Sequence, residues 1–508
     1  MLHRGNNNRS ATDQNNNGKT SGINNEKDFP SFYTDSKPAD SFLTLKKQER
    51  LKQRTITGLR KIYWRHIFCI SICWTVLLFY MERYLVKSTI NQCAWNNWEA
   101  WDDTTGTIPY RVALFGDPQI MDNHSYPDRH WLINRITRLI LDSYHKKNWR
   151  YIQKDLNPDA SMFLGDLFDG GRYWDDKTWI EEFERFNRIF PKKRDHKFVA
   201  SLPGNHDIGF GDTVVESSYN RFETYFGETS SIMDLGNHTF VLVDTISMSD
   251  SKIPHISQKV YDFLDRVESY RTQSAFPRIL LTHVPLYRIP DTQTCGFERE
   301  STKLFPMMKG DQYQTVIDQQ RSSVVLSKVD PKLIFSGDDH DYCHVTHEFE
   351  VSYKNEKAIH SAEEITTKSS AMNMGIKKPA VHLLSLYNPL YSYVTKETKT
   401  YENFVCYLPD PYKPLFCYAI AALLTLFYVI LICFAPRFYN RNLIKSNRKE
   451  SILPTFNNNS KKNPFICGYR DALYSFKVDE NKSFMTFLSN STILTGIILL
   501  MLWYYFSR

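Results

Sequence analysis

Five short polar runs hold the side chains of this sequence that could do chemistry. Each follows an apolar run that predicts a strand: Gly116-Asp117-Pro118-Gln119, Gly165-Asp166-Leu167-Phe168-Asp169, Gly204-Asn205-His206-Asp207, Thr282-His283-Val284-Pro285 and Gly337-Asp338-Asp339-His340. Asp, Asn and His side chains hold pairs of divalent metal ions about 3.5–4 Å apart in enzymes that cleave phosphate esters. A lone Gly-Asp pair or a lone histidine is common without any metal. Five such runs in one order favour a shared metal centre.

Two of the runs place a pair of potential ligands two residues apart. Asp117 and Gln119 form one pair, and Asp338 and His340 form the other, so both side chains of a pair can point into one crevice. Asp166 follows a glycine that lets the backbone approach closely, and its two oxygens could bridge two metal ions. We therefore expect Asp117, Asp166, Asp338 and His340 among the metal ligands.

The remaining side chains add a neutral oxygen and two imidazole rings. Asn205 offers an amide oxygen and His283 an imidazole nitrogen as further metal ligands. His206 is the candidate proton donor to the leaving oxygen, because a positioned imidazole exchanges protons near neutral pH. Asp207 is expected to orient His206. Asp169 could bind a metal, hydrogen-bond a ligand or cap the following helix, and a supporting role is favoured for it.

Short apolar runs alternate with amphipathic stretches through the middle of the chain, which predicts an α/β fold. In sheets with helical crossovers, the loops at the carboxyl ends of the strands gather into one crevice, and the five runs follow such ends. Apolar residues at helical spacing predict helices near 131–144, 179–190 and 260–267, each with its stripe packed into the core. The predicted strands are 111–115, 161–164, 198–202, 240–244, 278–281, 332–335 and 381–386.

With these motifs the chain resembles the calcineurin-like metallophosphoesterase superfamily over about residues 110–345. The superfamily pattern runs Asp-x-His, Gly-Asp, Gly-Asn-His-Asp/Glu, His and Gly-His-x-His, in the order of the five runs. The resemblance implies a four-layer α-β-β-α sandwich and two divalent metal ions. It implies that one ion is held by Asp117, Asp166 and His340, the other by Asp166, Asn205, His283 and Asp338, and that His206 is the catalytic histidine.

Two positions depart from the superfamily pattern. Gln119 stands where the first motif has a histidine, and Asp338 where the last motif has one. A carboxamide is a weaker ligand than imidazole, so Gln119 is expected to bind a metal only through water. Asp338 contributes an anionic oxygen, which favours Mn²⁺ or Mg²⁺ over zinc.

The closer resemblance is to the membrane-anchored branch of this superfamily that acts on glycosylphosphatidylinositol (GPI) anchors, the fungal cell-division-control and animal post-GPI-attachment type. The runs 116–120, 165–172 and 336–343 look like that branch's versions of the motifs. The resemblance implies removal of a side-branch ethanolamine phosphate from a GPI mannose, with Mn²⁺ as the favoured ion. It also implies a place in GPI-anchor remodelling and in export of GPI proteins from the endoplasmic reticulum to the Golgi.

Two other functions remain open from the residues. One is a phosphatase or phosphodiesterase acting on another lumenal sugar or lipid phosphate. The other is a metal-poor scaffold that binds GPI-anchored cargo without cleaving it, which the altered positions Gln119 and Asp338 would allow. A product assay separates the first from GPI processing, and elemental analysis tests the second.

Three apolar segments predict a membrane protein. A signal-anchor is expected at 67–85, although its uncharged stretch is short enough to suit a buried core helix instead. Transmembrane helices are expected at 415–434 and 484–506, with basic residues after the first of these on the cytosolic side. The remaining regions are a disordered cytosolic tail at 1–44, a basic juxtamembrane segment at 45–66, a lumenal catalytic domain at 93–413 and a basic cytosolic loop at 435–483.

Charge and cysteines agree with this layout. The net charge of +7 comes largely from the clusters beside the apolar segments, so it indicates membrane orientation and not a nucleic-acid partner. Two disulfides or four free thiols are equally compatible with the four cysteines of the lumenal region, Cys93, Cys295, Cys343 and Cys406. Two glycosylation sequons begin at Asn123 and Asn237. We expect an endoplasmic reticulum or Golgi membrane protein.

Overall fold

The computed structural model describes residues 61–101, 107–123, 125–270, 274–289, 294–302, 305–310, 313–353, 356–389, 399–449 and 475–507 of the 508-residue chain. The expected tail at 1–44, most of the basic segment at 45–66 and residues 450–474 of the expected cytosolic loop lie outside the described residues.

The first sheet has five strands in the order β13-β12-β1-β2-β3. β1, β2 and β3 run parallel, so their carboxyl ends meet at one edge, while β12 and β13 run antiparallel to their neighbours. These strands are β1 (Tyr110–Phe115), β2 (Ala160–Phe163), β3 (Lys197–Val199), β12 (Ala380–Leu386) and β13 (Tyr401–Tyr407).

The second sheet has six strands in the order β10-β11-β9-β6-β5-β4. β5, β6, β9 and β11 are parallel, and β4 and β10 close the two edges as antiparallel strands. The strands are β4 (Ser231–Leu235), β5 (His238–Leu242), β6 (Arg278–Leu281), β9 (Leu333–Ser336), β10 (Cys343–Tyr353) and β11 (Glu356–Thr366). A separate small pair consists of β7 (Lys309–Gly310) and β8 (Tyr313–Gln314).

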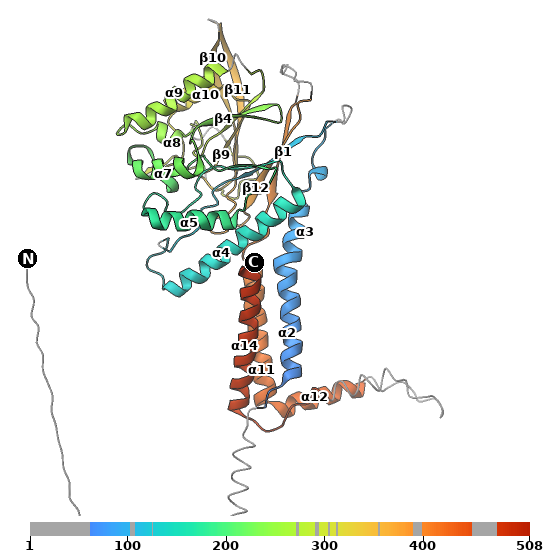
Figure 1. The fold of residues 1–508 in the computed structure, drawn as a ribbon. Helices are drawn as coiled ribbons and strands as arrows, with labels where there is room; N and C mark the ends of the chain where they lie inside the picture. The colour runs from blue at the N-terminus through green and yellow to red at the C-terminus, as the bar shows by residue number, and fades with distance from the viewer. Residues whose placement is uncertain are drawn as a thin grey trace, which may run out of the picture. The chain divides into compact units, whose positions relative to one another are not determined.

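The two sheets pack face to face between helices, as labelled in Figure 1. One apolar cluster lies between the sheets and joins residues such as Leu114 and Met162 to Leu281 and Phe335. α4 (Trp131–Tyr151) and α5 (Asp176–Ile189) cover the outer face of the first sheet, and α9 (Pro254–Tyr270) and α10 (Gln319–Val329) cover that of the second. The expected four-layer α-β-β-α sandwich is therefore confirmed. Three more helices connect the layers: α6 (Asn205–Ile208), α7 (Glu216–Phe226) and α8 (Thr245–Met248).

All seven predicted strands are present, but the expected burial of the apolar stripe is wrong for the first half of one helix. α5 and α9 bury their apolar stripes as predicted, for example through Trp179 and Leu264. On α4, in contrast, Trp131, Ile136 and Leu139 are 65%, 49% and 37% exposed. The helix packs on the domain through a different face, which carries Leu141, Tyr144, Asn148 and Trp149, so the apolar stripe of its first half points away from the core.

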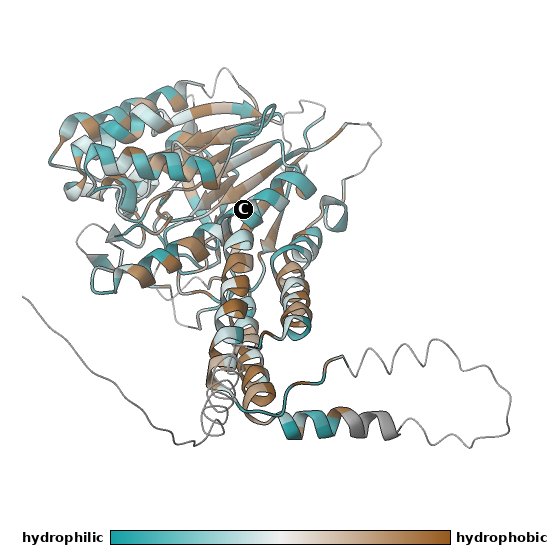
Figure 2. Cartoon of the chain, turned by 60° about the horizontal axis from the view of Figure 1, so that its bottom comes forward, coloured by the Kyte–Doolittle hydropathy of each residue, from teal (hydrophilic) through white to brown (hydrophobic). Residues whose placement is uncertain are grey.

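Three helical segments are long and apolar enough to cross a membrane. The first is continuous over Trp64–Asn91 and consists of α2 (Trp64–Phe79), a π-helical turn η1 (Tyr80–Tyr84) and α3 (Leu85–Asn91), so it exceeds the predicted anchor. The others are α11 (Lys413–Phe434) and α14 (Phe484–Ser507). α2, α11 and α14 lie side by side in Figure 1, and apolar residues colour these helices mostly brown in Figure 2. α12 (Pro436–Lys449) follows α11.

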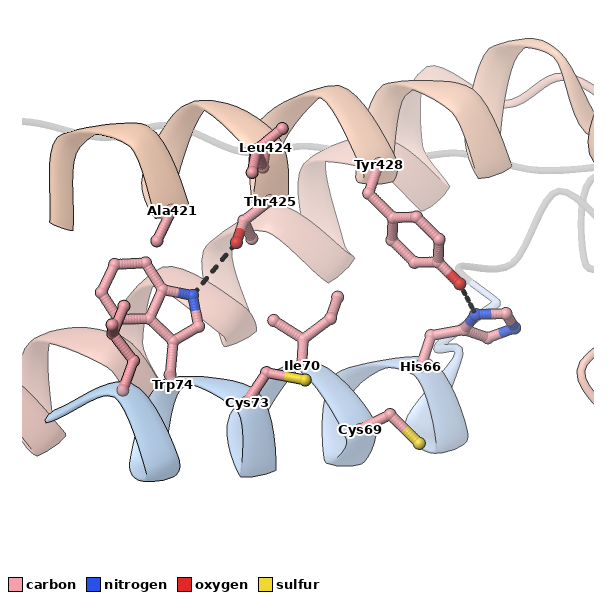
Figure 3. Close-up of a pocket in the computed structure, with 10 residues that line it drawn as sticks. His66, Cys69, Ile70, Cys73, Trp74, Ala421, Leu424, Thr425 and Tyr428 are labelled. Carbon is pink, nitrogen blue, oxygen red and sulfur yellow. Dashed lines mark hydrogen bonds between the residues drawn. The ribbon is translucent and has the colours of Figure 1, made fainter. Parts of the chain in front are cut away.

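Polar side chains fix the register between α2 and α11. Trp74 Nε1 donates to Thr425 Oγ1 at 3.0 Å, and His66 Nδ1 lies 2.8 Å from the hydroxyl of Tyr428 (Figure 3). Such hydrogen bonds stabilise helix association where water is absent. A groove of about 390 Å³ between the two helices is lined mainly by apolar side chains, with Cys69 among them.

One disulfide and one buried ion pair hold the spanning helices to the domain, and a second disulfide closes a loop within the domain. Cys93, just after α3, is bonded to Cys406 on β13, and Cys295 is bonded to Cys343 at the start of β10. The disulfide alternative for these four cysteines is therefore the one that the structure contains. Glu82 in η1 accepts a hydrogen bond from Lys147 of α4 at 2.8 Å. Tyr418 of α11 donates to the other Glu82 oxygen at 2.6 Å.

Candidate metal centre

The five polar runs converge where the carboxyl ends of the two sheets face each other. Asp117 follows β1, Asp166 follows β2 and Asn205 follows β3 in the first sheet. His283 follows β6 and Asp338 follows β9 in the second. Because the strands that carry them are parallel within each sheet, the loops collect on one rim although the residues are far apart in sequence.

The first group of donor atoms belongs to Asp117, Asp166 and His340, whose ligand atoms lie within 4.8 Å of one another. Asp117 and Asp166 are fully buried. Asp117 Oδ1 accepts a hydrogen bond from the backbone N–H of Asp338 at 3.0 Å, which ties the first sheet to the second. Its other oxygen, Oδ2, is buried and has no hydrogen-bond partner among the described residues.

The second group surrounds the ring of His283. Its Nδ1–H donates to the carbonyl of Leu164 at 2.7 Å, which leaves Nε2 as the nitrogen available to a metal. Nε2 lies 3.4 Å from Asn205 Oδ1, 3.5 Å from Asp166 Oδ1 and 3.6 Å from Asp338 Oδ1. Asp166 thus belongs to both groups.

The negative charge of the carboxylates around His283 favours binding of a cation. Burial lowers the pKa of His283, but the carboxylates of Asp166, Asp338 and Asp117 outweigh it and raise that pKa well above its ordinary value. A proton on His283 then offsets part of the negative charge of these buried carboxylates, and a divalent ion would take its place. The donor set of carboxylate, amide and imidazole, together with the unpartnered Asp117 Oδ2, fits divalent metal ions.

Backbone strain is concentrated at this rim. Asp117, Gln119, Asp166, Asp338 and His340 have φ angles of 40°, 31°, 46°, 65° and 66°, in the left-handed region that residues other than glycine rarely adopt. Each such residue costs about 1–3 kcal/mol and persists only where surrounding contacts enforce it. Such strain is typical of side chains held for function.

Two glycines allow the loops to approach each other. A Cβ on Gly204 would lie 2.0 Å from Asp166 Oδ1, so any side chain there would displace that carboxylate. Gly165 has a φ of +92°, and a Cβ there would lie 2.5 Å from Nδ1 of His283. These positions require glycine because backbone and ligand atoms are almost in contact.

His206 projects into the site from the start of α6 and is partly exposed. Its Nδ1–H donates to the carbonyl of Asp169 at 2.7 Å, and the Asp169 carboxylate lies 3.4 Å from the same nitrogen. Nε2 is therefore the nitrogen that faces a ligand. Gln119 also donates to the Asp169 carboxylate, at 2.9 Å, so Asp169 supports both residues.

The expected role of Asp207 is wrong. Its carboxylate does not contact the His206 ring; it accepts backbone N–H bonds from Gly204, Leu167 and Phe168 at 2.8, 3.1 and 3.0 Å. Burial and the nearby Asp166 raise its pKa to about 7, against these hydrogen bonds, which lower it. Asp207 joins the second and third loops, and Asp169 is the residue that orients His206.

Two cations beside the site were missed at the sequence level. Arg172 donates to the backbone carbonyl of Asn205 at 3.0 Å, and the run Gly170-Gly171-Arg172 directly after the second motif could have indicated it. Lys368 is buried and forms a 2.6 Å ion pair with Asp341, just after the last motif. No sequence pattern marks Lys368, because it comes after β11 and reaches Asp341 only through the fold.

Comparisons with known proteins agree with the geometry. The calcineurin-like phosphoesterase family matches residues 110–342. Cell division control protein 1 of Saccharomyces cerevisiae is 47% identical over 449 residues, covering 85% of this chain and 89% of the yeast protein. Metallophosphoesterase 1 of Danio rerio is 29% identical, covering 53% of this chain and 71% of its own. Metallophosphoesterase 1 of Xenopus laevis is 24% identical, and the match covers 74% of this chain and 93% of the Xenopus protein.

Proposed function

The chain belongs to the calcineurin-like metallophosphoesterase family, and from this premise we propose that it removes a side-branch ethanolamine phosphate from a mannose of GPI anchors. It is a membrane-associated, metal-dependent phosphoesterase. The observation that supports the proposal most is the meeting of Asp117, Asp166, His283 and His340 at one rim of a domain fixed to spanning helices.

Two divalent ions, Mn²⁺ by preference, fit the two groups of donors. Asp117, Asp166 and His340 would hold one ion, and Asp166, Asn205, His283 and Asp338 the other. Asp338 and the shared carboxylate of Asp166 supply anionic oxygens, which favour Mn²⁺ or Mg²⁺ over softer ions. Bound ions of this kind lower the pKa of a coordinated water and stabilise charge on a phosphoryl group.

His206 is the proposed proton donor. Water attacks phosphorus, the bond between phosphorus and the mannose oxygen breaks, and His206 Nε2 protonates that oxygen as it leaves. The products are ethanolamine phosphate and the free mannose hydroxyl. Asp169 holds the ring for this step through Nδ1, and Arg172 steadies the neighbouring Asn205 loop.

A lumenal position in the endoplasmic reticulum or Golgi membrane suits this substrate. Two disulfides in the catalytic domain favour an oxidising compartment, and the basic residues Arg437 and Arg441 after α11 favour a cytosolic location for that end of the helix. An enzyme held in the membrane meets a lipid-linked glycan at high effective concentration. Loss of the activity would then impair GPI remodelling and export of GPI-anchored proteins.

The test is a product assay on the purified full chain. GPI glycans that carry the side-branch group are incubated with enzyme and Mn²⁺, Mg²⁺ or Zn²⁺, and the glycan and the released product are identified by mass spectrometry. Release of ethanolamine phosphate, abolished in a His206→Ala control, supports the proposal. Turnover of generic phosphodiesters with intact GPI glycan would refute it and favour another lumenal phosphoester.

The scaffold alternative predicts few metals and no hydrolysis. Convergence of the six proposed ligands on one rim argues against it, as does membership of an enzyme family. Elemental analysis of the same preparation measures the metal content directly, and two ions per chain are expected.

A further inference from the structure

The exposed face of α4 is unusual for the surface of a soluble domain. Five large apolar side chains project from its first half, Trp131, Leu132, Ile133, Ile136 and Leu139, and all are exposed. Contiguous apolar surface of this kind marks a contact with a protein or a membrane. The domain does not need this face for its own packing, because α4 contacts the first sheet through other residues.

The position of α4 relative to the spanning helices indicates which contact this is. Ile140, the residue directly after Leu139, packs into the cluster that Trp74, Tyr418 and Phe506 form between the spanning helices. Lys147 bonds to Glu82, and Figure 1 shows α4 passing the carboxyl-terminal end of α14. The apolar face therefore continues directly from surface that lies in the membrane.

The length of α11 places this contact at the edge of the bilayer. Leu415 belongs to the same cluster as Ile140, and the helix continues from Leu415 to Phe434. At 1.5 Å per residue these residues span about 30 Å, the thickness of the hydrocarbon core. Leu415, and with it the start of the apolar face of α4, lies at the boundary between acyl chains and headgroups.

The second half of α4 carries positive charge on the same face. Leu132, Ile136, Leu139, Lys146 and Arg150 follow one another along α4 at intervals of four, three, seven and four residues. Intervals of three, four and seven residues keep side chains on one side of a helix. The face thus changes along its length from apolar to basic, as in helices that lie in a membrane surface.

The basic half lines a cavity of about 790 Å³ beside the end of α14. None of the described residues that line it is acidic, and Ser507 of α14 places it at the level of the membrane surface. Its basic lining residues are Lys146, Arg150, Lys154 in the π-helical turn η4 (Ile152–Leu156), Arg188, Lys192 and Lys193. Burial and the nearby guanidinium of Arg83 lower the pKa of Arg150, as expected where cations are crowded together.

We propose that this face of α4 docks on the leaflet next to the catalytic domain. Its apolar half enters the boundary of the acyl chains, and its basic cavity binds the headgroup of an anionic phospholipid. A lipid occupant follows from the continuity with the spanning helices and from the charge of the cavity.

Docking of α4 would hold the metal centre over the bilayer. The loop that starts at Asp117 rests on α4, where Asn134 donates to the carbonyl of Tyr126 at 2.9 Å and Arg138 donates to Asn123. This docking does not depend on which phosphoester is cleaved.

The first experiment measures depth in the membrane. In the full chain, the unpaired Cys69, Cys73, Cys417 and Cys433 are replaced by alanine, and so is Cys467, which lies outside the described residues. This chain receives Ile136→Cys and an environment-sensitive fluorophore, and is reconstituted into phosphatidylcholine nanodiscs. Lipids with a nitroxide high on the acyl chain should quench this label at least threefold more than a label at Gln258→Cys, an exposed position on α9. Equal quenching would overturn the proposal. A shielded label without lipid quenching would also overturn it, in favour of a protein partner or a second copy.

The second experiment tests the headgroup. Binding of dioctanoyl phosphatidylinositol to the detergent-solubilised full chain is compared with dioctanoyl phosphatidylcholine and inorganic phosphate. The anionic lipid should bind at least tenfold more tightly than either, and Lys146→Gln, Arg150→Gln and Lys154→Gln together should abolish the difference. The control changes Lys252, Lys332 and Lys357 to Gln and should bind like the unmodified chain. The assignment of the cavity as a headgroup site would be overturned if the Lys146/Arg150/Lys154 variant bound the anionic lipid as tightly as the unmodified chain. It would also be overturned if inorganic phosphate bound as tightly as that lipid.

Discussion

Replacement of Gly204 by alanine is the sharpest test of the metal centre, because it adds one methyl group between two of its loops. Gly204 has a φ of −104°, which any residue can adopt, so the glycine is required for space and not for backbone conformation. An alanine Cβ would lie 2.0 Å from Asp166 Oδ1 and 2.2 Å from the Asp166 nitrogen.

The size of the effect follows from these contacts. An ordinary contact to carbon is about 3.4 Å or longer, so the loops must separate by roughly 1.4 Å. Separation would break the bond from His206 N–H to Asp166 Oδ1, which is 2.9 Å. A displacement of about 1 Å at a catalytic group typically costs about 100-fold in rate. The strain itself should destabilise the fold by about 1–3 kcal/mol.

The assay measures kcat/KM on a soluble aryl phosphodiester together with metal content and Tm. We expect Gly204→Ala to lose at least 100-fold in kcat/KM and to hold less than two metal ions per chain. Gly171→Ala is the matched control, since its Cβ would lie 3.2–3.3 Å from the nearest atoms and needs only a small adjustment. Full activity and two bound ions in Gly204→Ala would refute the claim that Asp166 requires this close approach.

Three further predictions test single side chains. His206→Ala should keep its metals and lose about 10²–10⁴-fold in kcat, so unchanged turnover would exclude it as the proton donor. Asp207→Ala leaves three backbone N–H groups without an acceptor and should lower the free energy of unfolding by about 1–3 kcal/mol, measured by denaturant titration; an unchanged value would contradict its bracing role. Burial raises the pKa of Glu364, but Arg288 and His347 lower it to about 2, so its ionised form stabilises the fold above pH 4.5 and this stability is lost as the pH falls from about 4.5 to 2. Glu364→Gln should flatten the fall of Tm across that window, and an unchanged slope would count against the network.

The ligands of the metal centre could be predicted because the signal is local. A buried apolar run followed by Gly-Asp or Gly-Asn marks the end of a parallel strand, and such ends share one rim whatever the rest of the fold. This signal predicts Asp117, Asp166, Asn205 and Asp338, and His283 is predicted in the same way from the end of the strand before it. Their meeting needed no knowledge of how the helices pack.

The partner of His206 could not be predicted in this way. Asp207 is its neighbour in sequence, yet Asp169 contacts the ring from a loop 37 positions away. The start of α6 turns the Asp207 carboxylate toward the backbone of residues 167 and 168, and only the packing of the two loops decides this. Proximity in the sequence favours Asp207 for this role, whereas the fold brings Asp169 to the His206 ring.

The exposed stripe of α4 shows a different limit. Helical periodicity reports that one face is apolar, but a face against a core and a face against a membrane have the same pattern. Strands β10 and β11 were also missed, although the sequence of β10 carries a signal for it. Val345, Phe349 and Val351 alternate with exposed polar residues, and this alternation predicts a strand.

The attachment of the catalytic domain constrains its substrate as strongly as the metal centre does. A flexible tether would let the centre sample many heights above the bilayer, but Cys93–Cys406 and the Glu82–Lys147 ion pair fix the first spanning helix to the domain at β13 and at α4. β13 is next to β12, which pairs with β1, and α4 covers the same sheet, so both attachments act on the sheet that carries Asp117 and Asp166. The metal centre is therefore held at a nearly constant height. A phosphoester at a set distance from its own lipid anchor meets that condition, whereas a soluble phosphoester would gain nothing from it.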